Sequence, residues 1–157
     1  MDSLDIFERV REYWTETDVD ILPPAAEVEI IDVFSRGGRL PVSRDVIRLY
    51  GTVGGFRDYS MDADANLSLW DLKKVRSDNM GYEGPEICFG DFLIGSHYFY
   101  LRFESDDHSS VLGGTHSPEV HSRFQGFGDE SLFCCPSIAE FFERYIQDPF
   151  RGCHGWT

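Results

Sequence analysis

The chain has 157 residues, 41% of them hydrophobic, and its 28 Asp and Glu against 14 Lys and Arg give a formal net charge of −14. The length suits a single domain, and the 13 Phe, 7 Tyr and 3 Trp can fill a core, which argues against intrinsic disorder. The negative excess repels phosphate backbones and anionic lipids, so we expect neither a nucleic-acid partner nor a membrane-surface role. We predict one domain over residues 1–148 and a C-terminal tail at residues 149–157.

The sequence also bears on the compartment. The segment Met1–Trp14 has neither the basic start nor the apolar stretch of a signal peptide. No run approaches the ~18 apolar residues that a membrane span needs. We therefore expect a cytoplasmic protein whose 4 cysteines are thiols.

Three helices are predicted in the first 50 residues. Apolar residues recur at helical spacing from Ser3 to about Thr15. Pro23-Pro24 open a second helix over residues 25–35, which Gly37-Gly38 end. A third helix runs over residues 43–50, with Ser43 as its predicted N-cap.

Strands follow after Gly55, where the apolar period becomes shorter. Leu67 and Leu69 alternate with polar neighbours, as half-buried strands do. Residues 104–110 are predicted as a hairpin connection because Ser105-Asp106-Asp107 form a polar turn. The predicted strands lie at 67–69, 87–89, 92–94, 99–103, near Val111 and, more weakly, at 120–124.

The last predicted helix begins at a capping box, Ser137-Ile-Ala-Glu140, in which the Ser hydroxyl and the Glu carboxylate each accept a backbone N–H of the first turn. Five apolar residues then share one face before Pro149 stops the helix: Ile138, Phe141, Phe142, Tyr145 and Ile146. We predict an α+β fold in which the N-terminal helices and this C-terminal helix pack on one side of a largely antiparallel sheet.

No metal site is expected. Asp62-Ala-Asp-Ala-Asn66 opens like a calcium loop, but Leu67 stands where that loop needs Gly and Lys73 where it needs Glu, so we predict a turn. His116 and His121 are five residues apart, a spacing that puts the two rings on different faces of a strand or a helix. The cysteines show no zinc spacing.

No enzyme or cofactor is expected either. The sequence has neither a G-x-S-x-G elbow nor a G-x-x-x-x-G-K-[ST] phosphate loop. A Cys–His pair such as Cys134 with His116 could be assembled only by folding. The acid pairs are expected by chance among 28 carboxylates.

Charge is unevenly distributed along the chain. Residues 1–35 hold ten acids and two bases, whereas residues 36–50 hold four Arg and one Asp. We expect these arginines, at positions 36, 39, 44 and 48, to pair with nearby acids. As candidate partner-binding residues we name four acids in polar turns, which are usually exposed: Asp62, Asp64, Asp106 and Asp107.

The order of several short motifs resembles the SUKH superfamily of Smi/Knr-like domains. The motifs are the Pro-led acidic segment 23–30, the Leu40-Pro41 step and the Gly54-Gly55 pair. Segment 69–75 is similar to a strand-to-turn segment of that family, and 137–146 to its closing helix. The likeness covers roughly residues 1–148.

The resemblance implies an α+β protein-binding module without catalytic groups. Bacterial members are commonly immunity proteins that bind and neutralise a cognate toxin, often a nuclease, and fungal members regulate cell-wall synthesis through protein contacts. A strongly acidic protein suits a basic nuclease as partner. Two alternatives stay open: an intracellular regulatory or adaptor module, and a small cytosolic enzyme or ligand binder with an unrecognised pocket.

Overall fold

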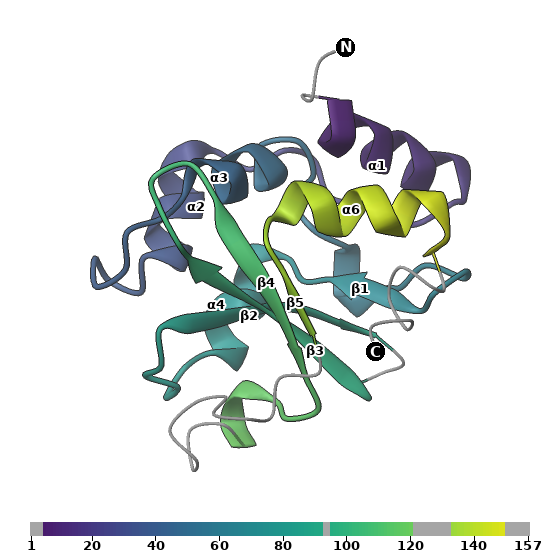
Figure 1. The fold of residues 1–157 in the computed structure, drawn as a ribbon. Coiled ribbons are helices and arrows are strands. Elements are labelled where there is room, and N and C mark those ends of the chain that lie inside the picture. Colours follow the sequence, from purple (N-terminus) through teal and green to yellow (C-terminus); the bar gives the residue numbers. More distant parts are fainter. Residues whose placement is uncertain (1–4, 93–94, 121–132, 150–157) are drawn as a thin grey trace.

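The computed structural model describes residues 5–92, 95–120 and 133–149. These residues form an antiparallel sheet with helices packed against it (Figure 1). The strands are β1 (Leu67–Leu69), β2 (Glu86–Phe92), β3 (His97–Phe103), β4 (Ser109–Gly114) and β5 (Phe133–Cys135). They lie in the order β1-β2-β3-β4-β5, each antiparallel to the next. The helices are α1 (Asp5–Glu16), α2 (Glu27–Phe34), α3 (Arg44–Tyr50), the 3-10 turn η1 (Arg57–Tyr59), α4 (Leu72–Asp78) and α6 (Ile138–Gln147). The predicted α+β class, with a C-terminal helix packed on an antiparallel sheet, is confirmed.

Helix α6 packs on one face of the sheet and α1 lies beside it (Figure 1). The Phe141 ring meets the Phe99 ring of β3 edge-on, with 4.8 Å between centroids. Phe142 turns toward α1, with its centroid 5.8 Å from that of Trp14. All four rings are buried, so the apolar face predicted for the last helix is a central part of the core.

The start of α6 follows the predicted cap in one half only. The Ser137 hydroxyl accepts the backbone N–H of Glu140 at 3.0 Å. The Glu140 carboxylate accepts the Cys135 thiol at 3.4 Å, instead of returning to the cap amide. Ser43 stands at the predicted N-cap position of α3, but its hydroxyl makes no cap hydrogen bond. It donates to the carbonyls of Ser105 and His108 and joins α3 to the β3–β4 hairpin.

The opposite face of the sheet is covered as well, as the continuous apolar runs at 87–89 and 92–94 indicate, although the helices were predicted to pack on one side. Phe99 and Tyr100 are neighbours in β3 and therefore point to opposite faces. Tyr100 packs edge-on against Tyr82, in the segment that follows α4. Asp71 caps α4 by accepting the Lys74 N–H at 2.8 Å. Helices therefore lie on both faces, not on one.

Three strand predictions change. The two runs at 87–89 and 92–94 belong to one strand, β2, whose register shifts between Cys88 and Gly90, and residues 93–94 lie outside the described residues. Strand β1 is buried at all three positions, because both faces of the sheet are covered there. Residues 118–120 form a helical turn, whereas 121–124 lie outside the described part.

The Gly54-Gly55 pair is required by close approaches of the backbone. A Cβ on Gly54 would lie 2.3 Å from the Pro23 carbonyl oxygen. Gly55 has φ +107° and a Cβ there would lie 2.5 Å from Asp71 Cα. The pair exchanges hydrogen bonds with Leu22, since Gly54 donates to its carbonyl and Leu22 donates to that of Gly55. This motif of the resemblance therefore has a packing role in this chain.

The docking of α6 predicts large effects of truncating its rings. We expect Phe141→Ala and Phe142→Ala each to lower the free energy of unfolding by about 3–5 kcal/mol, the usual range for buried Phe. Glu143→Ala, on the partly exposed side of the same helix, should change it by less than about 0.5 kcal/mol. Urea titration of the three variants measures these values. A loss below about 1.5 kcal/mol for both Phe variants would show that α6 is not docked as described.

Candidate functional site

Asp62 is buried, so its predicted exposure is wrong. Only 1% of the residue is accessible. Its carboxylate accepts the Tyr145 hydroxyl from α6 and the backbone N–H of Ala65, the latter at 2.6 Å. The residues predicted to form a turn do so, since Asn66 N–H returns to the Asp62 carbonyl. The side chain points inward because it supplies the acceptor that the buried tyrosine needs, and it cannot contact a partner.

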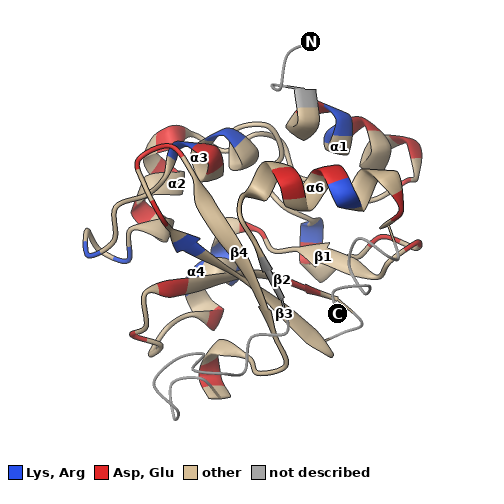
Figure 2. Ribbon diagram, viewed as in Figure 1, with Lys and Arg blue, Asp and Glu red and all other residues tan. Residues whose placement is uncertain are grey.

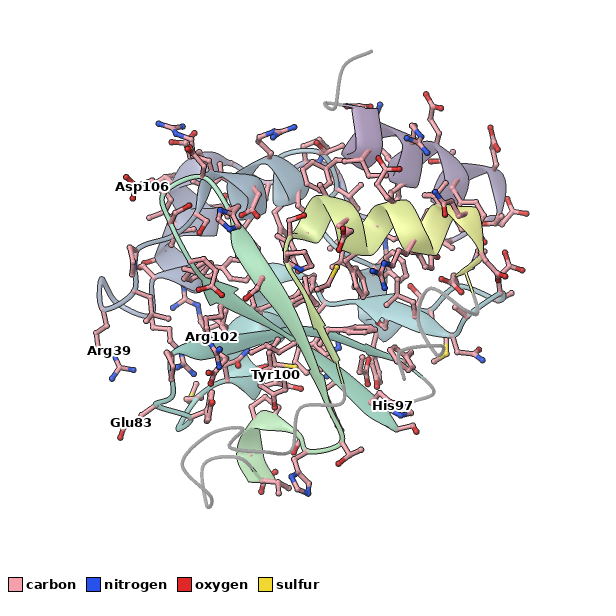
Figure 3. The ribbon with its side chains drawn as sticks, viewed as in Figure 1. Arg39, Glu83, His97, Tyr100, Arg102 and Asp106 are labelled. Carbon is pink, nitrogen blue, oxygen red and sulfur yellow. The ribbon has the colours of Figure 1, made fainter. Side chains whose placement is uncertain are left out.

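The other three candidates are exposed but do not form one site. Asp64 accepts the Tyr13 hydroxyl and lies beside α1. Asp106 and Asp107 occupy the tip of the β3–β4 hairpin, next to the start of α3, where the Arg44 N–H donates to the Asp106 carbonyl (Figure 3). The structure therefore leaves two separate acidic positions from the predicted set.

The arginines of segment 36–50 do not pair with acids in the described residues. Arg36 donates to the carbonyls of Gly84 and Asn79 at 2.8 and 3.1 Å, and its guanidinium lies 5.2 Å from the Tyr82 ring centroid. Arg48 lies over the Phe7 ring at 5.3 Å. Both are held within the chain, as expected, but by carbonyls and rings instead of carboxylates.

Helix α2 carries exposed apolar side chains among acids. Val28 is 73% exposed and Ile31 is 38% exposed, one helical turn apart, whereas Ile30, Val33 and Phe34 fill the core. Acidic side chains at positions 27, 29 and 32 are exposed around them, and Figure 2 shows the acidic colouring on this helix. We call the residues Glu27, Val28, Glu29, Ile31 and Asp32 the α2 surface.

A shallow groove adjoins the α2 surface. It has a volume of about 470 Å³ and lies between the Leu22–Ala26 segment, Glu29 and the start of α4 at Leu72 and Lys73. The sequence held a signal for this surface, since Val28 and Ile31 are apolar residues outside the inward stripe of the second helix. The helical spacing places both residues in the second helix but does not show that their side chains are exposed.

A second feature that the sequence analysis missed is a cavity of about 330 Å³ beside α4. Asp91, which is 1% exposed, lies in its wall and accepts hydrogen bonds from the Tyr59 hydroxyl and from Trp70 Nε1, the latter at 3.1 Å. Tyr98, paired with Asp91 across the strands, sets its ring edge-on to Trp70. We call this space the Asp91 cavity.

The Asp91 cavity combines a buried carboxyl group with strained backbone at Asp58 and Tyr59. Loss of solvation is the main cause that raises the pKa of the Asp91 carboxyl, against the opposing effects of its hydrogen bonds from Tyr59 and Trp70. Asp58 and Tyr59 have φ of 53° and 58°, two consecutive side-chain-bearing residues in the left-handed region. Such conformations persist only where the surroundings impose them, and here the hydrogen bond to Asp91 holds Tyr59.

Cys88 and Cys135 are buried thiols. Both are free, and burial raises the pKa of Cys135 to about 12 and that of Cys88 well above its usual value. Neither is therefore a thiolate at neutral pH. In the described ranges no three His, Cys, Asp or Glu side chains are grouped as a metal site would require. Within those ranges, every helix is too short or too polar to cross a bilayer.

No protein-family model and no curated protein matches this chain.

The burial of Asp62 predicts an effect on stability that its surface counterparts lack. We expect Asp62→Ala to lower the free energy of unfolding by about 1–3 kcal/mol, because the Tyr145 hydroxyl and the Ala65 N–H lose their acceptor inside the protein. Asp106→Ala, at the exposed hairpin tip, should change it by less than about 0.5 kcal/mol. Denaturant melts of the two variants test this, and equal losses would contradict the assignment.

The raised pKa of Asp91 predicts a pH dependence of a stated sign. The native state holds the Asp91 proton more tightly than the unfolded chain, in which the carboxyl has its ordinary pKa of 3.8. This contribution to stability is complete below that value and is lost as the pH rises through the native pKa. The wild type should therefore lose stability relative to Asp91→Asn as the pH rises from 3.8 through the native pKa of Asp91.

Parallel melting curves of the wild type and Asp91→Asn, taken at half-unit pH intervals upward from pH 3.5, measure this difference. Other carboxylates contribute equally to both proteins, so the comparison isolates Asp91. A constant difference across the series would show that the Asp91 pKa is not raised.

Proposed function

We propose that this protein is a non-catalytic module that binds a protein with a basic surface. The observation that carries the proposal is the α2 surface, where Val28 and Ile31 are exposed to solvent beside the carboxylates of Glu27 and Glu29. The third acid of this surface, Asp32, is paired with Arg76 of α4. An apolar centre with a polar rim is the common anatomy of protein–protein interfaces. The net charge of −14 adds a field that draws in a basic partner.

The partner class that we propose is a cognate bacterial toxin, most simply a basic nuclease. The support is the resemblance of residues 1–148 to the SUKH superfamily, in which bacterial members are commonly immunity proteins. The Pro-led acidic segment of that resemblance, residues 23–30, leads into the same helix that exposes Val28. A regulatory role in the cell, also exercised by protein contact, is the alternative within this proposal.

The α2 surface is preferred over the two acidic turns for a physical reason. Asp64, Asp106 and Asp107 supply charge alone, and exposed charges contribute little affinity because water and salt screen them. On α2 the charges surround apolar side chains whose burial would release ordered water. The hairpin acids therefore serve as the natural comparison in the experiment.

The first test identifies the partner and then removes the apolar centre. A protein captured from the native host should dissociate about tenfold faster from Val28→Ser/Ile31→Ser, because hot-spot side chains contribute 1.4 kcal/mol or more. Met80→Ser is the comparison, since Met80 is 75% exposed and lies outside the α2 surface, in the lining of the Asp91 cavity; it should dissociate at the wild-type rate if the α2 surface is the contact. Unchanged dissociation in the double variant would remove the α2 surface from the interface.

The second test separates charge at the two acidic positions. Glu27→Gln/Glu29→Gln should slow association at low salt, and raising the salt should abolish the difference from the wild type. Asp106→Asn/Asp107→Asn makes the same change of charge at the hairpin tip and should slow association less. The proposal fails if the hairpin variant alone is slowed, or if the isolated protein transforms a small molecule with turnover.

A further inference from the structure

The Asp91 cavity already holds a cation on an aromatic wall. The Lys74 ammonium lies 4.4 Å from the centroid of the Tyr59 ring and 4.6 Å from that of the Trp70 ring. It also donates to Asp78 at 2.8 Å. Two ring faces and a carboxylate around one ammonium form the arrangement that proteins use to recognise organic cations.

We call the Tyr59 ring, the Trp70 ring and the Asp78 carboxylate around Lys74 the cage. Asp91 holds the two rings of the cage in position. The same two rings that face Lys74 donate hydrogen bonds to its carboxylate, Tyr59 through its hydroxyl and Trp70 through its indole N–H. Donation to a carboxylate pushes electron density into the rings, which strengthens their attraction for a cation. The left-handed backbone at Tyr59 is maintained in the same contact, so the geometry of the cage is imposed on this loop.

The remaining space in the cavity has a matching charge. Among the described residues, the acids Asp78, Asp91 and Glu119 and the base Lys74 line it. Its volume of about 330 Å³ is at the lower end of the range for ligand sites, which suits one side chain or a small amine and excludes a drug-sized ligand. An acidic, aromatic space of this size favours a cation and disfavours phosphates and carboxylates.

We propose that the Asp91 cavity binds an organic cation of the guanidinium or alkylammonium type, and that Lys74 occupies the cage as a resident competitor. The cation is either a basic side chain presented by a protein or a free small amine, because both carry the same recognised group. Two positive charges would repel each other in the cage, so the incoming group displaces the Lys74 ammonium toward solvent. The Lys74 side chain is 27% exposed and can make this movement. This inference does not depend on the proposed function.

Removal of the resident cation gives a test that misfolding cannot imitate. The probe is the peptide acetyl-Gly-Arg-Gly-amide, and its neutral isostere with citrulline in place of Arg is the control ligand. Binding is followed by calorimetry and by the indole N–H resonance of Trp70, assigned through Trp70→Phe. Lys74→Met should bind the Arg peptide at least about tenfold more tightly than the wild type, since the cation–π contacts with two rings are no longer contested.

Matched variants complete the experiment. Lys73→Met removes the neighbouring, exposed lysine, which does not line the cavity, and should leave binding unchanged. Asp78→Asn, made in the Lys74→Met protein, should weaken it, because Asp78 is the carboxylate that holds the Lys74 ammonium in the wild type. Agmatine distinguishes the sources: affinity equal to that of the peptide assigns the site to free amines, and weaker affinity assigns it to peptide side chains. The proposal is overturned if Lys74→Met binds no more tightly than the wild type, or if the citrulline peptide binds as well as the Arg peptide.

Discussion

A buried chain of hydrogen bonds links three segments that are far apart in the sequence. Trp14 of α1 donates its indole N–H to the Tyr145 hydroxyl of α6 at 2.8 Å, and that hydroxyl donates to Asp62. All three side chains are inaccessible, so each depends on the next for the partner that water would otherwise supply. Asp62 then closes the turn that leads into β1, through the Asn66 N–H and the Leu67 carbonyl. The position of β1, the edge strand near α1 and α6, therefore depends on this series of hydrogen bonds.

The same dependence extends to both candidate sites. Trp70 directly follows strand β1; its indole N–H donates to Asp91 and its ring faces the Lys74 ammonium. The backbone around Trp70 also receives the Tyr50 hydroxyl of α3, at 2.7 Å from the carbonyl oxygen. Tyr50 in turn packs against Phe34 of α2, with 5.1 Å between ring centroids. The cavity and the α2 surface are thus supported by one continuous core.

The acidic character of the chain divides into an internal and an external part. Asp45, Asp62, Glu86 and Asp91 are buried, and each accepts hydrogen bonds that join two elements. Asp45, for example, holds the start of β4 on α3 through the Ser109 N–H at 2.7 Å. All four carboxylates hold elements of the fold together, and Asp91 also lines the Asp91 cavity. The basic partner that we propose would meet the exposed acids instead, of which those on α2 lie beside exposed apolar side chains (Figure 2).

The sequence by itself determined the helix at 138–147, the hairpin at 104–110 and the α+β class, because periodicity, caps and turn residues act over a few positions. Only the tertiary structure decided that Asp62 is buried and Asp106 exposed, although both lie in polar turns. The reason is that the hydroxyl of Tyr145, more than 80 residues away, donates its hydrogen bond to Asp62. It also decided that Lys74 meets Tyr59 and Trp70, which needs the sheet register and α4 together. Local pattern fixes which face of an element is apolar, whereas contact between distant elements decides which polar groups are removed from water.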